Sequence, residues 1–153
     1  MKKIFKIISL VLAGVLCFAF SGCSKSSQAG GIRGVQKGEN KNYTKNSDGY
    51  YQISPEVAHE MMVVESDYVI LDVRTKSEYN DYHILNAVLL PDTEIIDRAN
   101  EVLPDKSKKI LVYCRSGRRS KNAAAELAAM GYSNVWEFGG IIDWPYDTVT
   151  VNE

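Results

Sequence analysis

Cysteine and histidine are scarce in this chain of 153 residues, which contains three cysteines and two histidines. Beyond residue 23 the only cysteine is Cys114, which excludes a disulfide framework within the rest of the chain. The histidines, cysteines and acidic residues form no group with metal-ligand spacing, so we expect no metal site and no bound cofactor. A reactive role would explain the presence of a single thiol such as Cys114.

Long hydrophobic runs are also scarce. The longest, residues 7–20, spans about fourteen residues, whereas a transmembrane helix needs roughly 20. It follows a basic segment that contains Lys2, Lys3 and Lys6. A basic segment followed by a short apolar run is typical of a secretory signal peptide.

The end of this run, Phe20-Ser21-Gly22-Cys23, resembles the lipobox of bacterial lipoproteins, in which a small residue precedes a cysteine that becomes diacylated. Phe20 departs from the leucine that is usual there. The resemblance implies that residues 1–23 are a lipoprotein signal peptide, that Cys23 is lipidated, and that the protein is extracytoplasmic and anchored to a bacterial cell membrane. An uncleaved anchor helix with an incidental cysteine is the alternative.

Charge is distributed unevenly along the chain. Residues 1–49 hold eight Lys/Arg and two Asp/Glu, whereas residues 50–149 hold sixteen Asp/Glu and ten Lys/Arg. The acidic part should repel nucleic acid, so we expect no nucleic-acid partner. Residues 24–49 are rich in Ser, Lys, Gly, Asn and Gln, and this composition predicts a flexible linker before a folded domain at residues 50–149.

Short apolar runs alternate with helical patterns in residues 50–149. The runs that read as strands are 68–72, 87–90, 109–113 and 135–137. Helical patterns open at Pro55, Thr75 and Asp92, and a further one covers 121–130. The alternation predicts an α/β fold with a small central parallel sheet flanked by helices, in which ligands bind beyond the carboxyl ends of the strands.

Cys114 lies at such a strand end, before a polar loop and a helix start. Backbone N–H groups of this kind of loop can converge into an anion site that stabilises a thiolate. Basic residues crowd the same segment, at Arg115, Arg118, Arg119 and Lys121. The pattern therefore predicts a nucleophilic cysteine in a focused anion site. A buried structural cysteine followed by a solvated basic turn is the alternative.

The loop is similar to the active-site loop of single-domain rhodaneses, which follow Cys-x-x-Gly-x-Arg-Ser. The matching residues are Cys114, Gly117, Arg119 and Ser120. Other family motifs are matched upstream and downstream by Leu71-Asp72-Val73-Arg74, Glu78-Tyr79, His83-Ile84, Asn86-Ala87, Pro91, Gly139-Gly140-Ile141 and Trp144. Two departures, Tyr82 and Asn86, stand where the family has glycines, and we expect them to alter loop shape rather than chemistry.

The resemblance implies a rhodanese-like fold and a thiosulfate-type sulfurtransferase. Cys114 would take a sulfane sulfur from a small anionic donor, thiosulfate or polysulfide, and pass it from a persulfide to a thiol or cyanide. The residues implied to bind the substrate are Arg115, Ser116, Gly117, Arg118, Arg119 and Ser120. Arg119 is expected to matter most, unless it is a helix-start residue bonded to carboxylates. Asp72 and Arg74 are implied to support the architecture.

Three other functions fit parts of the pattern. A non-catalytic rhodanese-like binding module is one, although such modules lack the cysteine. A phosphatase or arsenate reductase follows Cys-x₅-Arg, which would place its arginine where this chain has Ser120. A redox relay would need a second cysteine in the domain. His83 could serve as a base, but persulfide transfer needs none, so we expect it to form structural hydrogen bonds.

Overall fold

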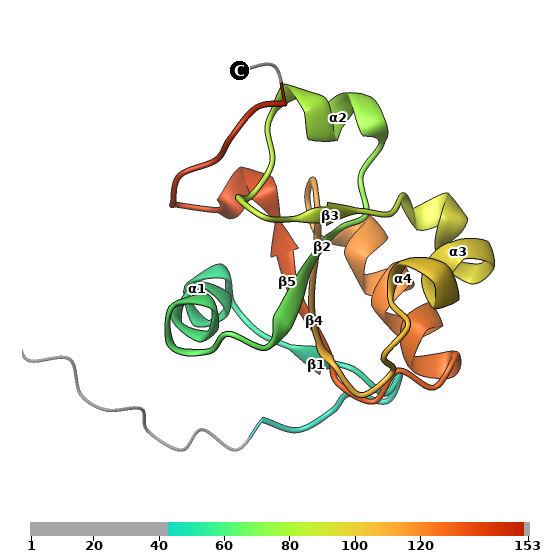
Figure 1. Cartoon of the computed structure of the whole chain (residues 1–153). Helices are drawn as coiled ribbons and strands as arrows, with labels where there is room; N and C mark the ends of the chain where they lie inside the picture. The colour runs from blue at the N-terminus through green and yellow to red at the C-terminus, as the bar shows by residue number, and fades with distance from the viewer. Residues whose placement is uncertain (1–42, 152–153) are drawn as a thin grey trace, which may run out of the picture. The chain divides into compact units, whose positions relative to one another are not determined.

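The computed structural model describes residues 43–151, so the expected signal peptide, Cys23 and most of the expected linker lie outside the described residues. These residues form a five-stranded, wholly parallel sheet with the strand order β1-β5-β4-β2-β3 (Figure 1). The strands are β1 Tyr51–Gln52, β2 Tyr68–Asp72, β3 Val88–Leu89, β4 Lys109–Cys114 and β5 Val135–Gly140. The predicted α/β fold with a central parallel sheet is confirmed.

Helices cover both faces of the sheet. They are α1 Pro55–Val64, α2 Lys76–Asp81, α3 Ile95–Val102 and α4 Arg118–Ala129, with short 3₁₀ helices η1 Asp92–Glu94 and η2 Ile141–Asp143. Figure 1 shows α1 on one side of the sheet and α3 and α4 on the other. Within residues 43–151, no helix is long and apolar enough to cross a membrane.

Side chains that point alternately to the two faces of the sheet form two apolar cores. Leu71 and Val112 pack with α3 and α4 on one face, whereas Ile70 and Leu111 pack with α1 on the other. Neighbouring residues of a strand point to opposite faces, so strands that are apolar throughout fill both cores. The three central strands β2, β4 and β5 are apolar for this reason, and their carboxyl ends lie at the same edge of the sheet.

The helix that follows Cys114 begins earlier than the sequence predicts. We expected a loop through Ser120 and a helix from Lys121, but α4 begins at Arg118. Gly117 turns the chain with φ 92 and stands at the helix N-cap. The prediction was wrong because Arg118 to Ser120 are polar, and polarity does not separate a loop from the first turn of a helix. The loop itself is only Arg115 to Gly117.

The ends of other helices and strands also differ slightly from the sequence-based prediction. The capping box of Thr75 and Glu78 is present as predicted, but Asp92 begins a 3₁₀ turn rather than capping α3. The strand expected at 135–137 is longer, because the pair Gly139-Gly140 completes β5. The edge strand β1 was not predicted, since two residues carry no recognisable pattern.

Part of the segment assigned to the linker packs against the domain. The ring of Tyr43 lies edge-on to Trp136, with centroids 5.3 Å apart. The Lys45 ammonium donates to the carbonyl of Ser133 at 2.8 Å. The packed part of the chain therefore includes residues before position 50.

Candidate active site

Cys114 is the last residue of β4 and lies at the carboxyl edge of the sheet, where the sequence places it. Its side chain is buried, with 1% of the residue exposed. The backbone N–H of Gly117 donates to the Cys114 sulfur at 3.1 Å. The loop therefore folds back over the thiol and points a donor at it, the arrangement that stabilises a sulfur anion.

The end of β5 holds this loop from the other side. A Cβ on Gly140 would lie 2.4 Å from the carbonyl oxygen of Arg115 and 2.5 Å from the Cα of Ser116. The N–H of Ile142 donates to the same Arg115 carbonyl at 3.2 Å. Only glycine fits at position 140, because the two backbones meet there. The downstream Gly-Gly motif thus shapes the Cys114 loop.

A buried carboxylate lies beneath the loop. Glu137, with no exposed surface, accepts at Oε1 from the Ser120 hydroxyl at 2.7 Å and from the N–H of Gly139 at 2.9 Å. Its other oxygen, Oε2, is buried without a hydrogen-bond partner among the described residues. Ser120 is also buried, so its hydroxyl faces the protein interior. Glu137 is not among the site residues that the sequence predicts, although one acid in an otherwise apolar strand is a recognisable signal.

Arg119 uses both terminal nitrogens on Glu78 of α2. The distances are 2.8 Å from Nη1 to Oε2 and 2.6 Å from Nη2 to Oε1. These hydrogen bonds are the main reason that the pKa of Glu78 falls to about 2. They also raise the pKa of Arg119, to which the negative charge of Cys114 adds a smaller contribution. Arg119 therefore lies near Cys114 but is bonded to a carboxylate, the alternative that the sequence left open.

The remaining residues of the predicted substrate site differ in exposure. Gly117 is buried, whereas Arg115, Ser116 and Arg118 are exposed. Neither Arg115 nor Arg118 has a salt bridge within residues 43–151. Two positive side chains thus remain free to meet an anion near the loop.

The structure brings Asp72 and Arg74 together as a buried ion pair at 2.6 Å. Tyr113 donates its hydroxyl proton to Asp72 at 2.7 Å and accepts from the N–H of Ile84 at 3.2 Å. Burial, followed by the charge of Asp72, raises the pKa of Tyr113. Arg74 also donates to the carbonyl of Tyr82 at 2.6 Å. This network ties the end of β2 to β4 directly before Cys114.

His83 has structural contacts. Its Nδ1 lies 2.9 Å from the carbonyl oxygen of Tyr79, and its ring stacks on the Tyr79 ring with centroids 3.8 Å apart. Its backbone pairs with Val149 in an antiparallel bridge. The ring and the backbone of His83 therefore both help to hold the segment after α2 in place. Among residues 43–151, no three His, Cys, Asp or Glu side chains are placed to hold a metal ion.

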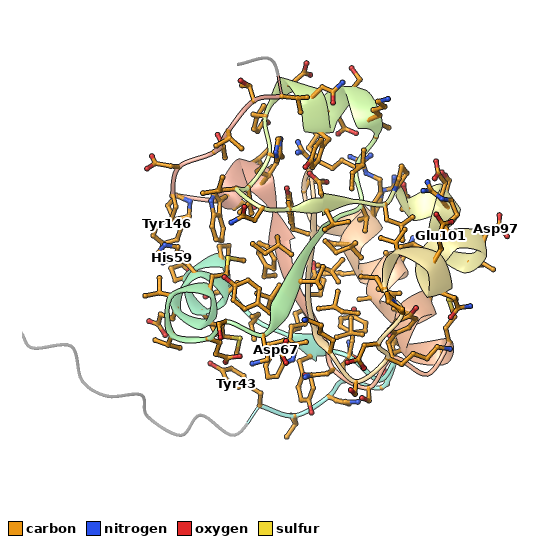
Figure 2. The ribbon with its side chains drawn as sticks, viewed as in Figure 1. Tyr43, His59, Asp67, Asp97, Glu101 and Tyr146 are labelled. Carbon is orange, nitrogen blue, oxygen red and sulfur yellow. The ribbon has the colours of Figure 1, made fainter. Side chains whose placement is uncertain are left out.

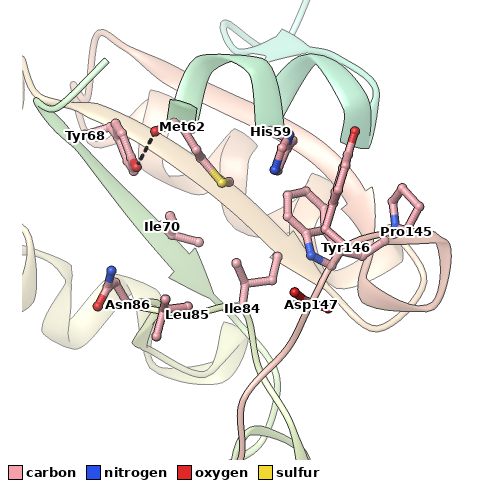
Figure 3. Close-up of a pocket in the computed structure, with 11 residues that line it drawn as sticks. His59, Met62, Tyr68, Ile70, Ile84, Leu85, Asn86, Pro145, Tyr146 and Asp147 are labelled. Carbon is pink, nitrogen blue, oxygen red and sulfur yellow. Dashed lines mark hydrogen bonds between the residues drawn. The ribbon is translucent and has the colours of Figure 1, made fainter. Parts of the chain in front are cut away.

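Two cavities open on the described part of the chain. One, of about 250 Å³, lies beside the Cys114 loop and is lined by Arg74, Glu78, Asp81, Tyr82 and Arg115. The other, of about 490 Å³, lies between α1 and the segment after η2 (Figure 3). Its wall includes His59 stacked on Tyr146 at 3.6 Å, and Figure 2 shows this pair beside α1. None of the predicted site residues lines the larger cavity.

Comparison with known proteins decides the family. The model of the rhodanese-like domain matches residues 54–145, which is more than half of the chain. The chain belongs to the rhodanese-like domain family. All elements from α1 through η2 lie inside the match, as do Cys114 and the loop, so the family assignment covers the candidate active site.

Two relatives of this chain are named as thiosulfate sulfurtransferases. The chain is 37% identical over 73 residues to thiosulfate sulfurtransferase PspE of Escherichia coli, covering 48% of this chain and 70% of that protein. It is 36% identical over 96 residues to thiosulfate sulfurtransferase GlpE of Coxiella burnetii, covering 62% of this chain and 87% of that protein. This member of the rhodanese-like family therefore has homologues named for sulfur transfer.

A solved structure agrees in fold. A rhodanese with anions from E. coli superposes with a TM-score of 0.51 at 34% sequence identity, covering 54% of this chain and 98% of that chain. That rhodanese domain is matched along almost its whole length, so structure as well as sequence shows the rhodanese-like fold.

Proposed function

We propose that this protein is a thiosulfate-type sulfurtransferase in which Cys114 is the nucleophile that carries the sulfur. The observation that carries the proposal is the buried Cys114 sulfur at the end of β4, with the N–H of Gly117 pointing at it from 3.1 Å. The names of the two relatives support it. Ser120 occupies the position of the phosphatase arginine, and its hydroxyl donates to Glu137 beneath the loop.

In the first step the Cys114 thiolate attacks the outer sulfur of thiosulfate. A Cys114–sulfur bond forms, the sulfur–sulfur bond of thiosulfate breaks, and sulfite leaves with the electron pair of that bond. The product is the Cys114 persulfide anion. The negative charge lies next to Gly117 and the N-terminus of α4, where N–H groups and the helix dipole stabilise anions.

In the second step a thiolate or cyanide attacks the outer sulfur of the persulfide. The new bond forms to that sulfur, the persulfide bond breaks, and its electron pair returns to Cys114 as a thiolate. The protein needs no external oxidant or reductant in this cycle, because the sulfur is transferred at the same oxidation level. The kinetic form is ping-pong.

Charged side chains divide into two groups in this mechanism. Arg115 and Arg118 are exposed and free, so they attract the anionic donor to the loop. Arg119 is a positioning residue, since its guanidinium holds α4 to Glu78. Asp72 and Arg74 keep the end of β2 against β4. The anions in the related E. coli structure agree with an anionic substrate.

The test follows the sulfur directly. Purified protein is incubated with thiosulfate alone, and its intact mass is compared with that of a Cys114→Ser variant. We expect a gain of one sulfur atom in the natural protein, none in the variant, and thiocyanate when cyanide is added. If neither thiosulfate nor polysulfide adds a sulfur, the proposal fails, and a non-catalytic binding module or a phosphatase takes its place.

We also propose that the lipoprotein signal peptide is cleaved directly before Cys23, and that a diacylated Cys23, now the first residue, anchors the domain to a bacterial cell membrane, outside the cytoplasm. The basic start, the short apolar run and the lipobox-like end support this. The mass of the N-terminal peptide tests it, beside a Cys23→Ser variant. A peptide that still begins at residue 1, or one without acyl chains, would overturn it.

A further inference from the structure

The smaller cavity borders the Cys114 loop through Arg115 and borders α2 through Glu78 and Asp81. Tyr82, a residue that is 39% exposed, also lines it. Glu78 connects the cavity to the active site, because it pairs with Arg119 in the first turn of α4, directly after the Cys114 loop. A molecule in this cavity would therefore lie next to the loop that holds the persulfide.

Four charged side chains line the cavity, and two of them are already neutralised. Arg74 is paired with Asp72, and Glu78 is paired with Arg119. Asp81 and Arg115 are exposed, and neither forms a salt bridge within residues 43–151. The cavity thus presents one free negative group from α2 and one free positive group from the loop.

We propose that this cavity binds the sulfur acceptor, and that the acceptor is a small thiol carrying both an ammonium and a carboxylate group. The proposal rests on the sulfurtransferase function proposed above. The acceptor carboxylate pairs with Arg115 and its ammonium pairs with Asp81. An acceptor with only one charge satisfies one of these groups and is repelled by the other.

The size of the cavity agrees with a small molecule. At about 250 Å³ it lies just below the roughly 300–1,000 Å³ that is usual for ligand pockets. An amino acid or a very short peptide fits such a space.

The transfer itself is an exchange between a thiolate and a persulfide. A persulfide places its outer sulfur about 2 Å beyond the Cys114 sulfur. The acceptor thiolate attacks this outer sulfur, a new sulfur–sulfur bond forms, and Cys114 leaves as a thiolate. The product is the persulfide of the acceptor. Charge and atoms balance, because one thiolate is consumed and one is released.

The test isolates this second step. Protein is first converted to the persulfide with thiosulfate, which is then removed, and discharge is followed by intact mass. Four acceptors are compared: L-cysteine with both charges, cysteamine with the ammonium, 3-mercaptopropionate with the carboxylate and 2-mercaptoethanol with neither. Rates are divided by the concentration of thiolate. We expect L-cysteine to be about fivefold faster than each singly charged acceptor, as partly exposed ion pairs allow.

Two substitutions test which charged group of the acceptor each residue binds. Asp81→Asn should slow discharge by L-cysteine and by cysteamine and leave 3-mercaptopropionate no slower. Arg115→Gln should slow L-cysteine and 3-mercaptopropionate and leave cysteamine no slower. Asp97→Asn is the matched control, because Asp97 is an exposed acid on α3, away from this cavity (Figure 2). It should change none of the four rates.

The results separate this inference from the proposed function. Equal rates for the four acceptors, or an equal effect of Asp81→Asn on all of them, would overturn the acceptor site while persulfide formation stays intact. Failure to form any persulfide would overturn the proposed function and this inference together. A loss of L-cysteine preference in Asp81→Asn, with normal loading by thiosulfate, would support both.

Discussion

Arg119 and Glu78, 41 positions apart in the sequence, are joined by two parallel hydrogen bonds of 2.8 and 2.6 Å. The pair connects the first turn of α4, which follows the Cys114 loop, to the first turn of α2. An arginine that matches the substrate-loop motif thus holds two helices together. This ion pair restricts the position of the Cys114 loop. Arg115 and Arg118 remain without a salt bridge in the described part of the chain.

The first prediction concerns pH and this pair. The pKa of Glu78 is lowered from 4.5 to about 2, so the folded state favours the charged carboxylate. A lowered pKa adds stability that is complete above about pH 4.5 and is lost as the pH falls toward 2. Glu78→Gln should therefore reduce the free energy of unfolding by about 1 kcal/mol at pH 7. The difference from the natural protein should shrink between pH 5 and pH 2.5 in urea titrations.

The control for this prediction is Glu94→Gln, which removes an exposed ion pair with Arg98 on α3. It should change stability much less at every pH, because solvent screens that pair. Gln is also accepted at the third position of a capping box, so Glu78→Gln leaves the start of α2 intact. A difference that stays constant from pH 7 to pH 2.5 would contradict the ion-pair explanation.

The second prediction concerns the carboxylate beneath the loop. Ser120→Ala removes the 2.7 Å hydrogen bond to Glu137 and leaves a buried carboxylate with one donor fewer. Such a loss costs about 1–3 kcal/mol of stability. We expect persulfide formation to slow as well, because α4 and the end of β5 are no longer fixed to each other. Urea unfolding and single-turnover mass measurements check the two effects.

A double-mutant cycle with Glu137→Gln decides whether the two residues act together. If they do, adding Ser120→Ala to Glu137→Gln should cost less than Ser120→Ala alone, since the carboxyl group that accepts from the hydroxyl is then gone. Additive effects on stability would show that Ser120 acts through another contact, such as the carbonyl of Gly117 at 3.1 Å.

Local pattern was enough to predict the sheet and the place of Cys114. The strands at 68–72 and 109–113 are apolar runs, and in a parallel sheet their ends share one edge. The pairing of Arg119 with Glu78 and of Ser120 with Glu137 could not be predicted, because it depends on residues distant in sequence. The start of α4 was missed for a different reason, since a polar first turn looks like a loop.

The third prediction concerns the contact of β5 with the loop. Gly140→Ala would place a methyl group 2.4 Å from the Arg115 carbonyl, and backbone cannot move aside cheaply. We expect a loss of about 1–3 kcal/mol of stability and at least about a tenfold slower persulfide formation, because the loop is pushed away from Cys114.

Gly131→Ala is the matched control for Gly140→Ala. Gly131 has φ 91 but nothing within 4 Å of an added Cβ, so alanine there suffers backbone strain alone. It should cost about 1–2 kcal/mol of stability and leave persulfide formation unchanged. Equal slowing of persulfide formation by both variants would show that general destabilisation, rather than the loop contact, is responsible.

The fourth prediction concerns a departure from the family pattern. Asn86 stands where the family has glycine, and it is the only non-glycine residue within 43–151 with a positive φ, at 65°. Asparagine tolerates this conformation better than most residues, which explains how the turn keeps its shape without glycine. Asn86→Gly should therefore change stability by less than about 0.5 kcal/mol, whereas Asn86→Ala should cost about 1 kcal/mol.

Neither Asn86 variant should alter the rate at which thiosulfate loads Cys114, because the turn lines the larger cavity and not the one beside the loop. Thermal unfolding and single-turnover mass measurements on the same samples decide this. If Asn86→Gly speeds loading severalfold without a matching change in stability, the turn acts on the active site. The departure from glycine would then be a change in chemistry rather than in local shape.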